Sequence, residues 1–425
     1  MERRNFFKAL AAGSFYLSIP TARAASQKDL ANLDMIETAA EVSSGRVSMF
    51  DISKAAMDRI DALNPHINAL VTKTYDYGVR QMAKNPTGPL AGVPYMLKDL
   101  NSLTGVRTTR GSRLFTSHTS SRQSPYTDNI LSSGVIILGK TNTPEFGLMP
   151  TTEPVANGAT RNPWNLDYSC GGSSGGAAAA VASRMIAASQ ASDGGGSIRF
   201  PAAACHLFGL KPSRGRFGDQ GYADQPVSLS VKHAISRTVR DSAFMLALTE
   251  NGPGATLPPV GYVEGPTNKK RKFALSMNAG NISPDYDTRR TVQKVARRLE
   301  GLGHEVEVVN STPHDSPLFQ DLFAGLWGQG AARLLDLAER VTGVPAAQSG
   351  LLEFATLKMI EFYVDKPIIE DARIKEILGD LENQMETFYR SYDGWISPMS
   401  PIPSPPLGYF TEGLEEGLAK GTQED

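Results

Sequence analysis

Serine and glycine residues are concentrated in one short segment of the chain, residues 170–205. The segment contains two glycine-rich runs, GGSSGG at 171–176 and DGGGS at 193–197, with an alanine-rich stretch between them. Because glycine loses more backbone freedom on folding than any other residue, such runs indicate a backbone geometry that serves a function. Two kinds of chemistry fit them: a cradle for a phosphate, or a pocket shaped around a nucleophilic serine.

The spacing of the glycines argues against a phosphate site. A Walker A loop has a lysine directly after its last glycine, and neither run has a lysine there. A dinucleotide-binding fingerprint needs glycines spaced as G-x-G-x-x-G, which GGSSGG does not provide. The sequence therefore favours a serine nucleophile over a phosphate cradle.

A serine nucleophile needs a base that removes its proton. No histidine accompanies the segment in a G-x-S-x-G elbow, and His206 is interpreted as a packed core residue. A lysine whose pKa is lowered by burial can act instead, and Lys98 is a candidate because it ends the apolar stretch GVPYML. The alternative is a structural ion pair between Lys98 and its neighbour Asp99, which the residues alone favour.

The net charge and the other residue patterns argue against several classes of function. A net charge of −1 over 425 residues argues against a nucleic-acid surface. The six histidines form no metal-binding motif, and no cofactor motif is found, so neither a metal nor a cofactor is predicted. The two cysteines, Cys170 and Cys205, are interpreted as free buried thiols, with a disulfide as the alternative.

The first 24 residues are typical of an export signal. Arg3 and Arg4 precede a short apolar run, and a small-x-small pattern predicts cleavage after Ala24. The Arg-Arg-x-Phe-Phe-Lys arrangement resembles a twin-arginine signal, so a periplasmic location is expected. The alternative is an ordinary amphipathic helix. No other stretch is long and apolar enough for a transmembrane helix.

The elements that must position these residues alternate between helices and strands. Apolar periodicity predicts a helix over 34–63 that stops at Asn64-Pro65. Residues 89–99 and 135–138 are predicted strands, and the alanine-rich residues 174–191 are predicted to be helical. This alternation indicates an α/β fold with a mixed or parallel sheet covered by helices.

The second half of the chain repeats the alternation less regularly. A linker rich in proline and glycine is predicted at 252–267, followed by a β-α-β pattern at 272–310. Residues 317–391 are expected to be mainly helical, and YDGWIS is expected to be a strand that runs into a proline-rich loop.

The stretch GGSSGG…SDGGGSIRFPA resembles the signature of the amidase signature family of serine hydrolases. GVPYMLKD is similar to the family's lysine segment, and GKTNTPEFG, RNPWN, FGLKPSRG and ISRTVRDSA are similar to its accompanying blocks in the same order. The resemblance covers roughly residues 30–407 and is strongest to the branch that contains 6-aminohexanoate cyclic dimer hydrolase. It implies a mixed central β-sheet covered by helices on both faces.

The resemblance also implies a catalytic triad and a reaction. Ser197 would be the nucleophile, Ser173 the bridging serine beside a cis peptide bond, and Lys98 the final base. A proton would pass from Ser197 through Ser173 to Lys98, and return to the leaving nitrogen during amide hydrolysis through an acyl-enzyme.

The second glycine run would then form an oxyanion hole. Backbone N–H groups of Gly194, Gly195, Gly196 and Ser197 would converge on the carbonyl oxygen. An ion pair between Asp193 and Arg199 is expected to support this loop structurally.

The resemblance gives an amidase domain over 25–425, with the signature core at 89–250 and a less typical, mainly helical region at 268–425. Family members usually continue beyond the SPPLG region, so a truncated C-terminal part is expected here. The expected partner is a small-molecule amide, with no nucleic acid and no stable membrane insertion, and a homodimer is left open. The alternatives are an inactive or unstable truncated protein and an amidotransferase subunit.

Overall fold

The computed structural model describes residues 27–217, 228–252, 254–278, 282–313, 317–364 and 369–411. The predicted signal peptide, residues 1–24, lies outside these ranges. Within them, no helix combines the length and the apolar character that a membrane crossing requires.

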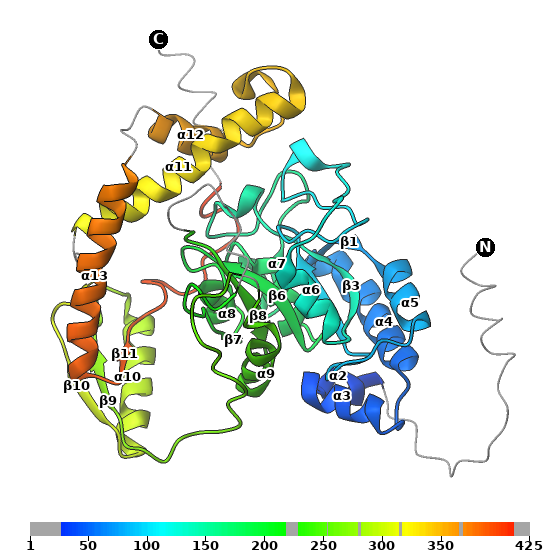
Figure 1. Ribbon diagram of the computed structural model, residues 1–425, viewed down its shortest axis with the longest axis horizontal. Helices are drawn as coiled ribbons and strands as arrows, with labels where there is room; N and C mark the ends of the chain where they lie inside the picture. Colours follow the sequence, from blue (N-terminus) through cyan, green and yellow to red (C-terminus); the bar gives the residue numbers. More distant parts are fainter. Residues whose placement is uncertain are drawn as a thin grey trace, which may run out of the picture.

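Two neighbouring three-stranded sheets form the centre of the molecule (Figure 1). Their strands, in spatial order, are β1 (Leu70–Lys73), β3 (Ile136–Thr141) and β2 (Pro94–Lys98), then β6 (Ala188–Asp193), β8 (Val231–Ser236) and β7 (Phe208–Gly209). In the first sheet β3 is antiparallel to β1 and parallel to β2, and the second sheet is antiparallel. Side-chain hydrogen bonds join the sheets, because Gln190 Oε1 on β6 accepts from Lys98 N at 2.9 Å and Ser189 Oγ donates to Met96 O at 3.2 Å.

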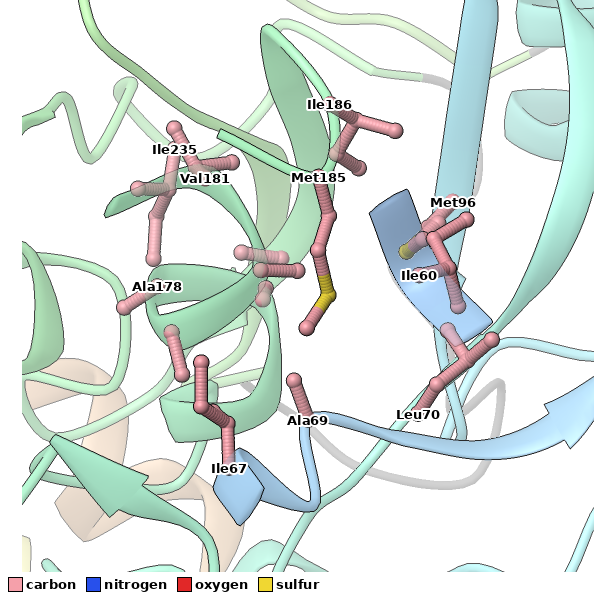
Figure 2. Close-up of a cluster of buried hydrophobic side chains, with 14 of the residues drawn as sticks. Ile60, Ile67, Ala69, Leu70, Met96, Ala178, Val181, Met185, Ile186 and Ile235 are labelled. Atoms are coloured by element: carbon pink, nitrogen blue, oxygen red, sulfur yellow. The ribbon is translucent and has the colours of Figure 1, made fainter. Parts of the chain in front are cut away.

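Helices cover both faces of these strands, which confirms the predicted fold class. On β2, Met96 packs into one apolar cluster and its neighbours Tyr95 and Leu97 pack into another, because successive side chains of a strand point to opposite faces. The first cluster includes Ile60 of α4 and Ala178 of α7 (Figure 2). The helices that supply the first cluster are α4 (Met49–Ile67), α5 (Tyr75–Ala83), α7 (Gly175–Ala182) and α8 (Arg199–Ala204), and those that supply the second include α3 (Met35–Ser43), α6 (Pro125–Ser132) and α9 (Val239–Thr249).

The predicted helix over 34–63 is two helices. α3 ends at Ser43, and α4 begins after Ser48, whose hydroxyl accepts the N–H of Asp51 as an N-cap. The expected stop at Asn64-Pro65 is wrong by about one turn, since Pro65 lies within α4 and the left-handed Asn68 ends it.

The alanine-rich stretch is also shorter as a helix than predicted. α7 ends at Ala182, and residues 188–191, expected to be helical, belong to strand β6. The residues of β6 pair in continuous antiparallel register with β8. This tertiary pairing outweighs the helix propensity of the alanines.

The C-terminal half contains a third sheet, which is parallel, with the order β10-β9-β11. Its elements are β9 (Lys272–Leu275), α10 (Tyr286–Gly301), β10 (Glu305–Val308) and β11 (Gly394–Ile396). The predicted β-α-β pattern and the strand in YDGWIS are therefore confirmed. The expectation that further C-terminal strands are missing stays a prediction.

The described residues between β10 and β11 are mainly helical, as predicted, and include α11 (Pro317–Thr342), α12 (Phe354–Val364) and α13 (Asp371–Ser391). Figure 1 shows α10 and α13 near the third sheet, while α11 and α12 lie together beyond the central sheets. The remaining short elements are α2 (Gln27–Asn32), η1 (Arg113–Phe115), η2 (Glu145–Gly147), β4 (Arg161–Asn162), β5 (Asn165–Ser169) and η4 (Ala346–Gln348).

Candidate active site

Lys98 is the last residue of β2, and its side chain is fully buried. Its Nζ lies 2.7 Å from Ser173 Oγ, 2.9 Å from Ser174 Oγ and 3.2 Å from Ser192 Oγ. Burial lowers the pKa of Lys98 from 10.5 to about 7, although the charge of Asp193 opposes this shift. A large share of the lysine is therefore neutral at neutral pH, and its lone pair can accept a proton from a serine hydroxyl.

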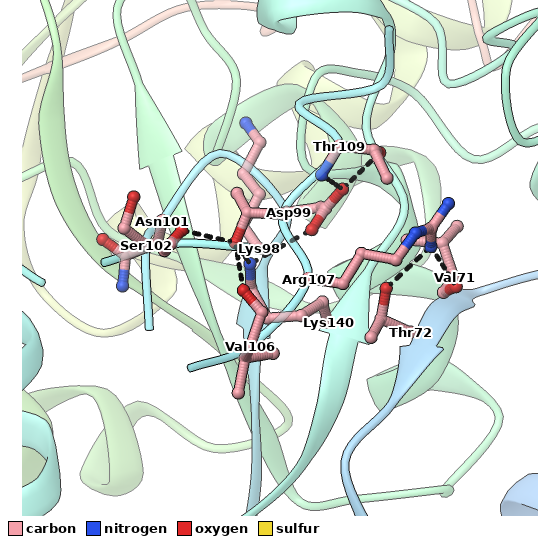
Figure 3. Close-up of polar contacts among 12 residues, drawn as sticks. Val71, Thr72, Lys98, Asp99, Asn101, Ser102, Val106, Arg107, Thr109 and Lys140 are labelled. Carbon is pink, nitrogen blue, oxygen red and sulfur yellow. Dashed lines mark hydrogen bonds and ion pairs between the residues drawn. The ribbon is translucent and has the colours of Figure 1, made fainter. Parts of the chain in front are cut away.

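Asp99 does not pair with Lys98, so the structural ion pair proposed as the alternative is not formed. Asp99 instead lies 3.1 Å from Nζ of Lys140 on β3, and both side chains are fully buried (Figure 3). The other carboxylate oxygen, Oδ2, accepts from Thr109 N at 2.9 Å and from Thr109 Oγ1 at 2.5 Å. Because consecutive residues at a strand end point in opposite directions, Asp99 finds its cation on the neighbouring strand.

Lys140 is a site-supporting residue that sequence reasoning missed. It lies in the segment GKTNTPEFG, which is similar to a block of the family but carries no assigned role there. The sequence feature that points to Lys140 is a second lysine at the end of a predicted buried strand. Parallel pairing of β2 with β3, which sets Lys98 opposite Thr141, brings Lys140 next to Asp99.

Ser173 follows a cis peptide bond from Gly172, as the family resemblance implied. A Cβ on Gly172 would lie 2.5 Å from Thr151 O and 2.6 Å from Thr151 N, so only glycine fits between this peptide and the backbone of residue 151. A Cβ on Gly176 would lie 2.3 Å from Asn142 N. These glycines let the start of α7 approach its neighbours closely enough for Ser173 to reach Lys98.

Ser197 lies in the turn between β6 and α8 and is 9% exposed. The expected ion pair next to it is present, because Arg199 Nε and Nη2 donate to the two oxygens of Asp193 at 2.9 Å and 3.0 Å. Asp193 also accepts the N–H groups of Gly196 at 2.8 Å and Ile198 at 3.2 Å. Burial alone would raise the pKa of Asp193, but its bonds to Arg199 and to the backbone outweigh burial and hold that pKa below its ordinary value.

The expected contribution of Gly196 to the oxyanion hole is not met in this structure. Its N–H is donated to Asp193 Oδ1 and so is not directed at a substrate. In contrast, the N–H groups of Gly194, Gly195 and Ser197 have no hydrogen-bond partner among the residues that the structure describes. Three donors therefore stay available beside the Ser197 hydroxyl.

The two cysteines are free and buried, with Cys205 Sγ 3.8 Å from Cys170 O. Burial raises the pKa of both thiols, which makes them poor nucleophiles. His206 is exposed, not packed in the core as predicted, because it lies in the turn after α8 with a positive φ of 58°, where its ring meets the edge of Trp164. Across the described ranges, no cluster of three or more His, Cys, Asp or Glu side chains could hold a metal ion.

The chain is similar in sequence to known proteins over most of its length. A family model described as amidase matches residues 51–420. An acylamidase of Rhodococcus erythropolis is 31% identical over 410 residues, which are 93% of this chain and 84% of the relative. A 6-aminohexanoate-cyclic-dimer hydrolase of Paenarthrobacter ureafaciens is 33% identical over 281 residues, 62% of this chain and 57% of that protein.

Solved structures agree with the sequence matches. The structure of 6-aminohexanoate cyclic dimer hydrolase complexed with substrate has a TM-score of 0.80 at 27% identity, and covers 91% of this chain and 83% of its own. A bacterial aryl acylamidase has a TM-score of 0.79 at 28% identity, with 88% and 81% coverage.

Proposed function

This chain belongs to the amidase family, and we propose that it cleaves amides through an acyl-enzyme formed on Ser197, with Ser173 and Lys98 as the proton relay. As a member of the family it is a hydrolase of carbon–nitrogen bonds other than peptide bonds. The observation that carries the proposed mechanism is the 2.7 Å contact between Nζ of Lys98 and Oγ of Ser173, two buried side chains.

The proposed reaction begins with the neutral amine of Lys98. This amine takes the proton of Ser173, which takes the proton of Ser197, and Ser197 Oγ attacks the amide carbonyl carbon. The relay then runs in reverse, so the leaving nitrogen receives a proton as its bond to carbon breaks. Water deacylates the enzyme with the same relay as its base.

The loop around Ser197 would stabilise the charge that develops on the carbonyl oxygen. We assign the N–H groups of Gly194, Gly195 and Ser197 to this role, because they have no partner within the described part of the chain and are adjacent to the nucleophile. Loss of one such donor typically costs about 3–4 kcal/mol of transition-state stabilisation. Asp193 and Arg199 act as positioning residues, since their hydrogen bonds fix the backbone from which these donors project.

Hydrolysis of a panel of small amides by the mature protein, residues 25–425, tests this mechanism. Wild-type protein is expected to release amine from at least one amide, and Ser197→Ala and Lys98→Ala are expected to lose this activity by about a thousandfold or more. Asn165→Ala is a matched control on the exposed strand β5 and is expected to stay active. Activity that survives both site substitutions would refute the relay.

We further propose that residues 1–24 direct export by the twin-arginine route and that the mature enzyme acts in the periplasm. The paired arginines, the short apolar run and the Ala22-x-Ala24 pattern support this proposal. Detection of the protein in a periplasmic extract, with its N-terminus at Ala25, tests it.

A further inference from the structure

Two aromatic side chains of α11 form a continuous apolar surface near the nucleophile. Phe323 and Trp327 lie one helical turn apart and stack, with ring centroids 5.7 Å apart and an interplanar angle of 28°. Phe319 extends the row by another turn, at 6.4 Å from Phe323. Phe323 and Trp327 are half-buried, so part of each ring stays accessible.

This surface lies directly against the loop assigned to the oxyanion hole. A Cβ on Gly195 would be 2.9 Å from Phe323 Cζ and 3.4 Å from Trp327 Cζ3, and a Cβ on Gly194 would be 3.4 Å from the same Trp327 atom. The rings therefore touch the backbone that donates the N–H groups. A carbonyl oxygen held by those donors places the rest of the substrate next to the rings.

An apolar side chain from another segment also flanks this loop. Met399, in the loop after β11, would lie 3.1 Å from a Cβ on Gly196, and it is 39% exposed. Methionine adapts its shape and makes favourable sulfur–aromatic contacts. Phe323, Trp327 and Met399 thus offer apolar and aromatic contacts on two sides of the residues that precede Ser197.

We propose that the substrates of this enzyme are amides that carry a planar aromatic group, whose ring packs on Phe323 and Trp327 with Met399 at its side. This inference rests on the proposed function of Ser197 and names the substrate class of that site. A flat ring can stack on the faces of Phe323 and Trp327 or contact their edges. A puckered ring of the same size makes poorer contacts of both kinds. Offset and edge-to-face aromatic contacts add about three- to tenfold in affinity beyond the area buried.

Two matched pairs of amides test the proposal by kcat/KM. Phenylacetamide and cyclohexylacetamide place the ring on the acyl side, while N-benzylacetamide and N-(cyclohexylmethyl)acetamide place it on the amine side. In each pair a methylene separates the ring from the amide and keeps the reactivity of the two members similar. The variants Trp327→Leu and Phe323→Leu remove each aromatic ring but keep an apolar side chain, and Leu318→Ala, on the opposite face of α11, is the control.

Wild-type enzyme is expected to prefer the aromatic member of at least one pair by about tenfold, mostly through KM, and the pair identifies the side on which the ring binds. Each Leu variant is expected to reduce this preference at least threefold, while Leu318→Ala keeps it. The proposal is overturned if the rates are equal within both pairs or if both Leu variants keep the wild-type preference. It is also overturned if an enzyme that is labelled at Ser197 hydrolyses none of the four amides. Absence of fluorophosphonate labelling at Ser197 in wild-type protein would instead refute the mechanism on which it rests.

Discussion

Replacement of Lys98 by methionine separates the proton chemistry of this residue from its packing. Methionine is apolar, nearly the length of lysine, and carries no charge. The folded protein holds the pKa of Lys98 at about 7, against 10.5 for a lysine in water. The shift corresponds to about 5 kcal/mol that opposes the charged form in the folded state. Loss of the amine also leaves the hydroxyls of Ser173, Ser174 and Ser192 without one partner, which costs about 1–3 kcal/mol each.

Removal of the buried amine and loss of its hydrogen bonds change the free energy of unfolding in opposite directions. The difference in stability between wild type and Lys98→Met is therefore more informative when it is measured as a function of pH. Between pH 7 and 10.5 the unfolded state holds more protons on residue 98 than the folded state does, so the stability of wild type rises with pH in this window, by about 1.4 kcal/mol per pH unit. Lys98→Met lacks this contribution. From about pH 8 to about pH 9.5, wild type is therefore expected to gain about 2 kcal/mol relative to the variant.

Urea unfolding of both proteins at these two pH values measures the effect, because contributions from all other groups cancel in the difference. Lys294→Met, which removes an exposed lysine from α10, is the control and is expected to follow wild type. The same pKa governs activity, so kcat/KM is expected to rise with pH to a plateau, with its midpoint near 7. A stability difference that stays flat across this range, or activity that is highest below pH 6, would refute a neutral buried lysine.

Three further sets of substitutions test separate parts of the chain. Lys140→Met leaves the buried carboxylate of Asp99 without its cation and is expected to lower the free energy of unfolding by about 3–5 kcal/mol in urea titrations, whereas the double variant with Asp99→Asn should recover part of the loss. Arg199→Gln removes the two-point contact to Asp193 and is expected to reduce kcat about tenfold with little change in KM; an unchanged kcat would show that the loop holds its shape without this contact. Replacement of Arg3 and Arg4 by lysine is expected to keep the precursor in the cytoplasm in a fractionation assay, and normal export of this variant would argue against the twin-arginine route.

The sequence predicted those features whose determinants are local or belong to a long motif. The strands that end at Lys98 and Thr141 follow from short apolar runs, and the pair Ser173 and Ser197 is implied by the long family motif. The role of each residue was inferred from the family resemblance, since the residues alone favoured an ion pair between Lys98 and Asp99. The structure separates these two neighbours, because strand alternation turns one towards the serines and the other towards Lys140.

Features that depend on tertiary contacts were not predictable from the sequence. Alanines at 188 and 191 favour a helix, and only pairing with β8 makes them part of a strand. The N–H of Gly196 is used by a side chain three residues earlier, a geometry that a motif does not specify. Apolar spacing identifies α11 as a helix, but gives no sign that Phe323 and Trp327 lie against a loop far earlier in the chain.

The central claim is that Ser197, activated through Ser173 and Lys98, forms the acyl-enzyme. Mass-spectrometric mapping of the mature protein after reaction with a fluorophosphonate tests it most directly, with Ser197→Ala and Lys98→Met treated in parallel. The adduct is expected on the peptide that carries Ser197, absent from Ser197→Ala and formed far more slowly in Lys98→Met. An adduct on Ser173 or on another residue, or labelling of Ser197→Ala equal to that of wild type, would contradict the assignment.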